Sequence, residues 1–421
     1  MSYVPLFNGK KEIFTALGVV LVLAFVSLFV EYYYYSSFIK EPIQIQTATV
    51  LNHYQRKKAD KNKVYDVVKL KLDSGEEIYT VSWKPLRLEL KSRVKVKFEL
   101  KNTPSFAQYL KGFFVPSSYI YKIYEDNPPF NAKFLYHFVK NQHEDVMMQE
   151  FYNALLFATP LSKELRESVQ KWGITHLIAI SGYNVGVISF LLFFLLKPIY
   201  VFFQSRYFPH RHVMADLMPI VFIVLIGYMI IIDYVPPFMR AVVMSMMGFF
   251  FVSRGVKVLS FEMLFIVTFG LLAVIPSLFF SLSFWFSIAG VFYLFLFLHH
   301  IKWENKIALF LGLDAFVFLA MIPIVHTFFP VFTLLQLTSP LWSIVFLLFY
   351  PVGVLLHFIG QGGILDGIVM SFLGVKAHSY ELFIPLWFLI PYLIVSLGSI
   401  WSKKLLMVSF LLSLSAFCFI Q

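Results

Sequence analysis

The segment His176–Phe203, HLIAISGYNVGVISFLLFFLLKPIYVFF, decides the fold that we predict for this chain. Residues 185–203 are almost wholly apolar, and about 20 such residues cross the hydrocarbon core of a bilayer as a helix. Similar runs follow at 217–232, 238–253, 258–275, 282–298, 307–326, 331–357, 382–399 and 404–420. Together with an N-terminal run from Ile13 to Val30, they predict a polytopic α-helical membrane protein with about ten transmembrane segments.

The composition agrees with this prediction. Of the 421 residues, 59% are hydrophobic and 14% are charged, whereas soluble domains have roughly 45–50% and about 25%. A soluble globular protein is therefore excluded, and the 50 Phe and 23 Tyr exclude a disordered chain. The single cysteine, Cys418, excludes an intramolecular disulfide and a cysteine-based zinc site.

Residues 1–35 are predicted to form an uncleaved membrane anchor. Lys10 and Lys11 precede the apolar run, and basic residues favour the cytoplasmic side. A cleaved signal peptide is the alternative. However, Glu31 and the four tyrosines that follow it do not resemble a small-residue cleavage site.

Residues 44–125 are predicted to form a separate, extracytoplasmic β-domain. Apolar and polar residues alternate in 43–47, 68–72 and 94–98, which is typical of half-buried strands. About five short strands in 80 residues favour an OB-like barrel, with a small sandwich as the alternative. From Lys40 to Glu125 there are 17 Lys and Arg against 9 Asp and Glu, so this region carries +8 of the net charge of +11.

Basic and aromatic residues interleaved on a barrel are how OB domains hold single-stranded nucleic acid. An ordinary solvated face, or a patch that contacts lipid phosphates, is the alternative interpretation. The candidate DNA-binding residues are Tyr54, Arg56, Lys57, Lys58, Lys61, Lys63, Trp83, Arg93 and Lys95.

Residues 126–175 are predicted to be amphipathic interfacial helices, and residues 176–421 a polytopic channel domain. Within the channel domain, polar residues interrupt the apolar runs. Backbone groups exposed at membrane depth are energetically costly unless they face protein or water. A buried arginine such as Arg240 should face an aqueous path or a partner. Close helix packing and snorkelling to the headgroups are the alternatives. The candidate channel-lining residues are Ser181, Gly182, Asn184, Arg240, Arg254, Ser283, Ser287 and Asp314.

Enzymatic signatures are absent from the sequence. There is no Gly-x-Ser-x-Gly elbow and no P-loop, so we expect neither a hydrolase nor an ATPase. The pairs His210/His212 and His299/His300 lack the further ligands of a metal centre, so we expect no metal and no cofactor.

Three of these segments resemble motifs of the ComEC-type competence proteins, the inner-membrane DNA channels of natural transformation. The family pattern His-Leu-x-Ala-x-Ser-Gly-x-His-Val-Gly corresponds to His176–Gly186, and Pro-Ser-x-x-Arg-Ala-x-x-Met corresponds to Pro237–Met244, which is one residue shorter. A proline-led segment, Pro276 with Ser283–Ile288, is the third. The resemblance spans roughly Ile13 to Leu356, in the family's order of anchor, OB-like domain and polytopic domain.

This chain departs from the family at several positions. Asn184 replaces the usual histidine, Phe238 a serine and Trp285 a glutamine. The family's common metallo-β-lactamase-like domain does not follow before Gln421. The resemblance therefore implies transport without built-in strand degradation, with any nuclease a separate protein.

The resemblance predicts a channel that passes single-stranded DNA across the inner membrane into the cytoplasm. Expected partners are single-stranded DNA, membrane lipid, a periplasmic DNA receptor, and a cytoplasmic helicase or single-strand-binding proteins. The alternative function is a secondary transporter for a small anion, with Asp314 as a proton or ion relay.

Overall fold

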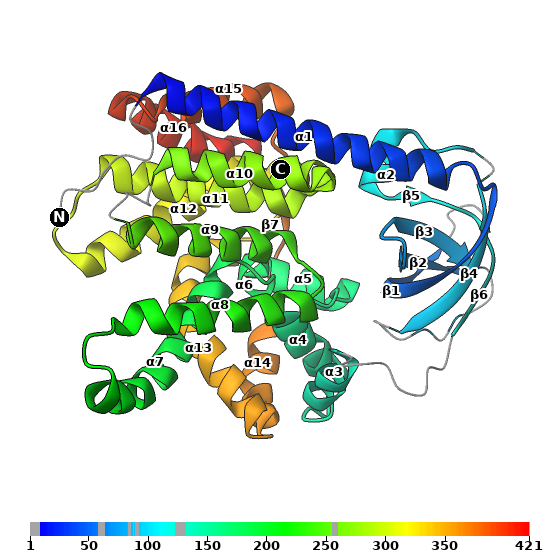
Figure 1. Cartoon of the computed structure of the whole chain (residues 1–421), viewed down its shortest axis with the longest axis horizontal. Coiled ribbons are helices and arrows are strands. Elements are labelled where there is room, and N and C mark those ends of the chain that lie inside the picture. The colour runs from blue at the N-terminus through cyan, green and yellow to red at the C-terminus, as the bar shows by residue number, and fades with distance from the viewer. Residues whose placement is uncertain are drawn as a thin grey trace. The chain divides into compact units, whose positions relative to one another are not determined.

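The structure, a computed structural model, describes residues 9–57, 64–82, 86, 88, 92–100, 102–122, 132–254 and 260–420 (Figure 1). The chain divides into two compact units. The first, which we call the β-unit, comprises Lys11–His137 and Phe269–Ser281. The second, which we call the helical unit, comprises Met1–Lys10, Phe138–Thr268 and Leu282–Gln421.

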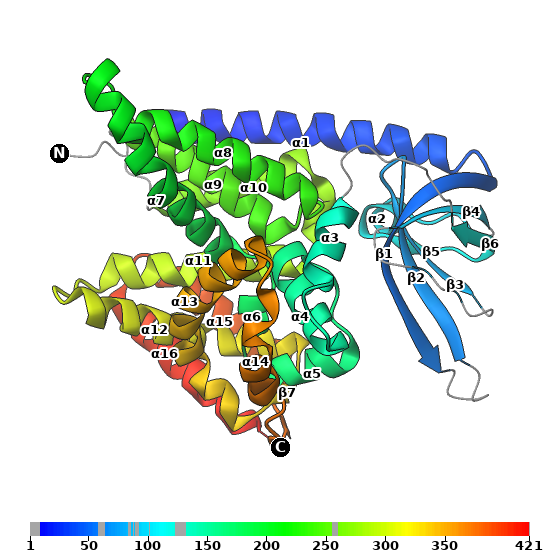
Figure 2. The same ribbon diagram turned by 90° about the horizontal axis from the view of Figure 1, so that it is seen from below.

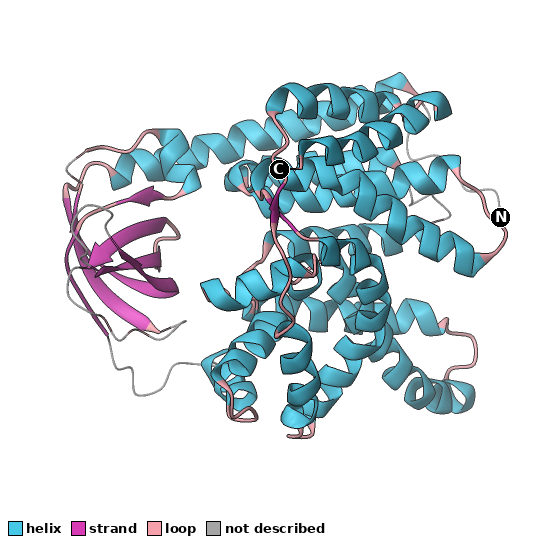
Figure 3. Ribbon diagram, turned by 180° about the vertical axis from the view of Figure 1, so that it is seen from behind, coloured by secondary structure: helices cyan, strands magenta, loops and turns pink. Residues whose placement is uncertain are grey.

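The β-unit contains a curved six-stranded sheet, shown in magenta in Figure 3. Its strands follow the order β5-β3-β2-β1-β4-β6, and all neighbours are antiparallel except β3 and β5. The bounds are β1 (Ile43–Lys57), β2 (Val64–Leu72), β3 (Glu77–Ser82), β4 (Arg93–Glu99), β5 (Phe113–Phe114) and β6 (Ser117–Lys122), with α2 (Phe106–Lys111) before β5.

The period-2 alternation of the sequence separates the two faces of the sheet. In β4, Val94, Val96 and Phe98 are buried, whereas Lys95 and Lys97 lie on the outer face. Ala48 and Val50 of β1 and Val68 and Leu70 of β2 complete the same apolar interior. The strands predicted at 43–47, 68–72 and 94–98 are therefore confirmed.

A closed barrel is not shown. β5 and β6 occupy opposite edges of the sheet order, and no backbone ladder joins them among the described residues. Only Val115 and Pro116 separate these two strands in the chain, so the sheet must curl to bring its edges together. The Val115 amide donates to the Tyr79 carbonyl of β3 (2.8 Å), which anchors this crossing.

Helix α1 (Lys10–Phe38) combines a membrane-length segment with part of the β-unit core. None of the residues in its apolar window, within Lys11–Phe38, is buried, as expected of a helix that contacts lipid. At its end, Phe38 is buried against Phe98 and Phe113, and the Tyr35 hydroxyl donates to the Pro104 carbonyl (2.7 Å). The sheet interior is therefore completed by residues that precede the predicted domain start at 44.

The rest of the chain is mostly helical. Its long helices are α7 (Gly182–Tyr207), α8 (Val213–Ile231), α9 (Pro236–Val252), α10 (Phe261–Val274), α11 (Leu282–His300), α12 (Lys306–Phe328), α13 (Ser339–Phe358), α15 (Leu386–Gly398) and α16 (Lys403–Ser415). Shorter elements are α3 (Ala132–Lys140), α4 (Val146–Phe157), α5 (Lys163–Lys171), α6 (Thr175–Ile178), η1 (Pro276–Phe280), β7 (Val331–Phe332), η2 (Leu334–Thr338), η3 (Gly362–Leu365), α14 (Asp366–Leu373), β8 (Tyr380–Glu381) and η4 (Ala416–Phe419).

Every apolar run predicted from the sequence contains a helix, but the count of ten crossings is not shown. Among the described residues, six helical segments are long and apolar enough to span a membrane: Lys11–Phe38, Gly182–Tyr207, Val213–Ile231, Leu282–His300, Lys306–Phe328 and Leu334–Phe358. Helix α10 has 14 residues, a rise of about 21 Å, which is short of a hydrocarbon core of about 30 Å. The chain is a polytopic membrane protein with at least these six candidate spans.

Segment 126–175 contributes to the interior of the helical unit. Met148, Phe151 and Tyr152 of α4 are buried and pack with Phe346 and Tyr350 of α13. The start of α4 is capped by Asp145, whose carboxylate accepts from the amides of the second and third helical residues. The interfacial position of this segment stays a prediction.

Candidate functional site

A buried arginine marks the candidate site in the helical unit. Arg240 lies in the second turn of α9, after two prolines at the helix start, and is only 3% exposed. Its Nε and Nη2 atoms donate to Ser287 Oγ of α11 (3.0 and 2.6 Å), and Nη1 lies 3.6 Å from Met244 Sδ. Among the described residues, no carboxylate lies within 4 Å of the guanidinium. Within that part of the chain, Arg240 is therefore a desolvated cation without a counter-ion.

The N-terminal ends of three helices meet at this arginine. Gly182 is the first residue of α7, and a Cβ added there would lie 3.2 Å from Ala241 Cβ and 3.7 Å from Arg240 Nη2. Ser287 lies in the second turn of α11, as Arg240 does in α9. Because helix N-termini carry partial positive charge, the arrangement adds to the charge of Arg240 and favours an anion.

Gly182→Ala should therefore disturb the site through packing. The added methyl group would lie closer to Ala241 Cβ than ordinary van der Waals contact, so α7 and α9 must shift slightly apart, and we expect overpacking of this kind to cost about 1–3 kcal/mol. Thermal unfolding of the purified full-length protein should show a lowered midpoint. The matched control is Gly186→Ala, one turn further along α7, where no atom lies within 4 Å of the new Cβ. Equal midpoints for the two variants would contradict the tight packing of α7 on α9.

Asn184 shapes the start of α7. The Ser181 amide donates to Asn184 Oδ1 (3.0 Å), and the Tyr183 amide donates to Ser181 Oγ (3.3 Å), which completes a cap. Asn184 is fully buried and interacts with the Tyr350 hydroxyl of α13. Its Nδ2 atom makes no hydrogen bond of standard length and angle. Sequence reasoning missed Tyr350, because nothing in its apolar helix distinguishes it from other core aromatics.

The remaining predicted channel residues lie in different surroundings. Ser283 is exposed one turn before Ser287 on α11. Arg254 follows the end of α9, about 20 Å from Arg240 at the rise of a helix, and its guanidinium lies 3.9 Å from the centre of the Phe250 ring. Asp314 of α12 interacts with Ser343 of α13. Asp314 forms no ion pair with Arg240 or Arg254.

The outer face of the β-unit sheet carries a second candidate site. Register places Thr47, Lys95 and Tyr121 in one cross-strand row, and Ile45, Lys97 and Tyr119 in the next. The rings of Tyr119 and Tyr121 stack with centroids 5.6 Å apart, and the two residues are 38% and 50% exposed. Two lysines thus lie directly beside two exposed aromatic rings. Of these four residues, only Lys95 was among the predicted DNA-binding residues.

The other predicted DNA-binding residues are less favourably placed or are outside the described part. Arg93 pairs with Asp73, so its charge is already neutralised. Tyr54 lies opposite Val67 on the outer side of β1 and β2. The side chains of Arg56 and Lys57, at the end of β1, lie outside the described residues, as do Lys58, Lys61, Lys63 and Trp83.

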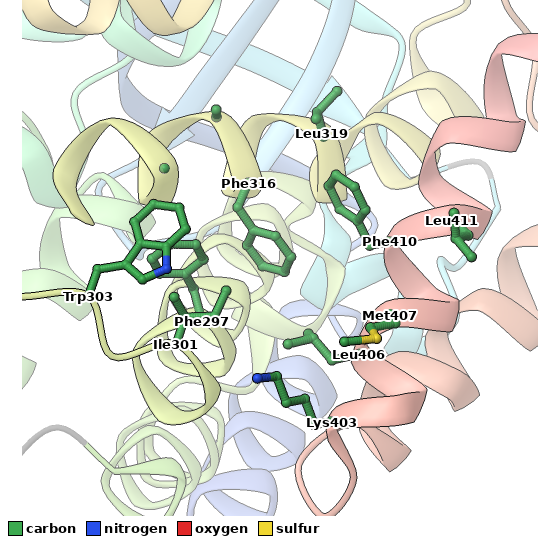
Figure 4. A pocket seen from close by; sticks show the side chains of 12 residues that line it. Phe297, Ile301, Trp303, Phe316, Leu319, Lys403, Leu406, Met407, Phe410 and Leu411 are labelled. Carbon is green, nitrogen blue, oxygen red and sulfur yellow. The ribbon is translucent and has the colours of Figure 1, made fainter. Parts of the chain in front are cut away.

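A cavity in the helical unit lies away from these sites, and the described residues form no metal centre. Within the described ranges, no three His, Cys, Asp or Glu side chains form a group that could hold a metal. A cavity of about 530 Å³ lies between α11, α12 and α16, and Figure 4 shows Phe297, Phe316, Phe410 and their neighbours around it. Of the described residues that line it, Lys403 alone is charged, so the cavity suits an apolar occupant and not a small anion.

Comparison with known proteins places the chain in a family. The family model described as Competence protein matches residues 158–420, which include α7, α9 and α11 and hence the whole Arg240 site. No curated protein and no solved structure matches the chain. The match covers well over half of the 421 residues, and the chain therefore belongs to the competence protein family.

Proposed function

We propose that this protein is a channel that passes single-stranded DNA across the inner membrane into the cytoplasm during natural transformation. Membership of the competence family supports a role in DNA uptake. The observation that carries the finer proposal is the buried guanidinium of Arg240, which has no carboxylate partner among the described residues.

Arg240 suits a passing phosphate for a physical reason. A buried charge without a counter-ion is unfavourable, and here the positive ends of α7, α9 and α11 add to it. An anion that arrives transiently would interact favourably with the guanidinium and with the three helix ends. Because Arg240 is held by hydroxyl and thioether groups and not by a fixed carboxylate, successive phosphates would not have to displace a strong competitor.

The β-unit would capture the strand outside the membrane. We propose that its curled sheet is an OB-like barrel, which the short crossing between the two edge strands supports. Bases would stack on Tyr119 and Tyr121, while Lys95 and Lys97 would contact phosphates. The binding energy would be largely independent of base sequence, as DNA uptake requires.

The proposed topology follows the distribution of basic residues. With Lys10 and Lys11 inside, the β-unit lies outside, and the loops at 206–212 and 302–306 fall inside. The short apolar helices α9, α10 and α15, together with α16, would bring the number of crossings to about ten, in part through protein-buried segments.

Transport would need energy from other proteins. An inside-negative potential opposes each entering phosphate by up to about 2.3 kcal/mol per 100 mV, and the sequence has no P-loop. We propose that the chain itself has no enzymatic activity. A periplasmic receptor would deliver the strand, a cytoplasmic helicase or single-strand-binding proteins would draw it in, and a separate nuclease would degrade the other strand.

The buried guanidinium of Arg240 also fits the alternative of a small-anion transporter, because a single guanidinium can bind a small anion as well as a phosphate group of DNA. In the structure Asp314 contacts Ser343 and not Arg240. A relay through Asp314 would therefore have to work at a distance from the anion. DNA binding by the β-unit separates the two functions, since only the channel needs it.

The proposed function is tested by deletion of the gene and tracking of labelled DNA. Labelled DNA should accumulate outside the cytoplasm in the deletion strain and enter it again when the wild-type protein is supplied. Cytoplasmic entry at the wild-type rate without the protein would refute the channel.

A further inference from the structure

A cluster of buried ionisable side chains lies away from the Arg240 site and plays no part in the proposed channel. His143 belongs to the loop between α3 and α4, His357 to the last turn of α13, and Asp366 is the first residue of α14. Figure 2 shows α4, α13 and α14 beside one another. His143 and His357 are 4% and 3% exposed, and the Asp366 side chain is 17% exposed.

The three groups form a line of short contacts. His143 Nδ1 lies 2.9 Å from both carboxylate oxygens of Asp366. On the other side of the ring, His143 Nε2 lies 2.9 Å from His357 Nε2. The second nitrogen of His357, Nδ1, lies 2.7 Å from the Gly353 carbonyl oxygen.

These contacts determine how many protons the cluster holds. The Gly353 carbonyl can only accept, so His357 Nδ1 must carry a proton and donate it. If Asp366 is ionised, His143 Nδ1 must also carry one. The two Nε2 atoms can then form a hydrogen bond at 2.9 Å only if a further proton lies between them. If Asp366 is protonated instead, it donates to His143 Nδ1, and the total number of protons is the same.

The charge balance favours retention of this proton. With it the cluster is neutral, whereas without it one net negative charge would lie in a mostly buried place. Other ionisable groups do not compensate. From α4, Tyr152 stacks on His143 (centroids 4.4 Å apart) and is neutral. In the loop, Glu144 is exposed and Asp145 caps α4. Among the described residues, no lysine or arginine lies within 4 Å of Asp366.

The surroundings hold the rings in place. The amide of Gln142 bridges two segments: its Nε2 donates to the His357 carbonyl (3.1 Å), and its Oε1 accepts from the Gly362 amide (2.8 Å). A Cβ on Gly362 would lie 2.6 Å from the His357 ring, so only glycine fits there. The close fit leaves the facing nitrogens little freedom to separate.

We infer that His143, His357 and Asp366 form a proton-binding site that fastens the α13–α14 corner to the α3–α4 loop. The bound proton joins the two imidazoles, and Asp366 is its counter-ion. When the pH rises far enough to remove the proton, two lone pairs face each other at 2.9 Å beside a buried negative charge, and the two rings separate. This inference goes beyond DNA transport and does not depend on it.

The test uses full-length protein in detergent, carrying a tag without histidine and ¹⁵N-labelled histidines. A proton held between two imidazoles gives a far-downfield proton resonance coupled to a histidine nitrogen. We expect one such resonance at neutral pH and its loss at alkaline pH. It should be absent from His143→Gln and His357→Gln. It should remain in the matched control His326→Gln, since His326 is equally buried in α12, and its ring contacts the Phe329 carbonyl and the Phe332 ring and no second imidazole.

Asp366→Asn should retain the resonance but lose it at a pH about 1–3 units lower, because an opposite charge at hydrogen-bond distance favours the protonated form by this amount. A second measurement follows folding. As the pH rises and the proton is lost, the unfolding equilibrium constant of the wild type should increase by up to tenfold per pH unit relative to that of His357→Gln.

Absence of the resonance from wild type at neutral pH, with nitrogen shifts that show both Nε2 atoms unprotonated, would overturn the proposal. So would one tightly bound zinc per wild-type chain that disappears in His357→Gln, because the facing nitrogens would then be metal ligands. The histidine resonances and the zinc content of the wild-type protein decide the question even if a variant fails to fold.

Discussion

Arg240→Ala should reduce transformation at least about 30-fold, because a desolvated charge interaction of this kind contributes roughly 2–5 kcal/mol. Its Nε and Nη2 atoms are held only by Ser287, so the guanidinium is available to a phosphate. Membrane abundance of the variant should equal that of the wild type, because removal of an unpaired buried charge is not destabilising. Transformation frequency and abundance are measured together, with labelled DNA to show that uptake across the outer membrane is unchanged.

Arg240→Lys separates charge from shape. It should retain part of the activity if one positive charge is sufficient, and little if the planar fork is needed. Arg206→Ala is the matched control, since Arg206 is an exposed arginine in the last turn of α7. Normal transformation by Arg240→Ala at normal abundance would remove Arg240 from the DNA path. A fall in abundance would assign it a structural role.

The second large effect is expected on the outer face of the β-unit. Tyr119→Ala with Tyr121→Ala should weaken single-stranded DNA binding by roughly 5- to 150-fold per tyrosine, because stacking contributes about 1–3 kcal/mol per base. Lys95→Ala with Lys97→Ala should instead flatten the dependence of log affinity on log salt by about 1.4, or 0.7 for each phosphate that is no longer neutralised. Anisotropy across a salt series with the full-length protein in detergent measures both.

Matched controls are available on the same unit. Phe114 on β5 is 58% exposed, and Lys111 ends α2; neither lies in the Lys95–Tyr121 or Lys97–Tyr119 rows. Phe114→Ala and Lys111→Ala should leave affinity and salt dependence nearly unchanged. If the wild-type protein does not bind single-stranded DNA at low salt, the capture role fails and the small-anion transporter is favoured.

Local sequence patterns were sufficient to predict the elements. The apolar run at 217–232 becomes α8, and the alternation at 94–98 becomes β4 with its lysines on the outer face. Such periodicities are properties of a few neighbouring residues, so they can be read without knowledge of the fold. They predicted less about the number of crossings, because the helix within an apolar run can be shorter than the run, as in α10 within 258–275.

Only the tertiary structure decided which residues meet. Arg240 and Ser287 are 47 positions apart, and His143 and His357 are 214 apart. Phe38 lies outside both the predicted anchor at 1–35 and the predicted domain at 44–125, yet it completes the core of the β-unit from the end of α1. The sequence by itself therefore determined the class of protein, its helices and strands, and Arg240 as a costly buried charge. Packing and strand register determined the partners of Arg240, the Lys95–Tyr121 row and the shared proton. They bring together side chains that are distant in the sequence, and the residues around each one do not indicate its partner.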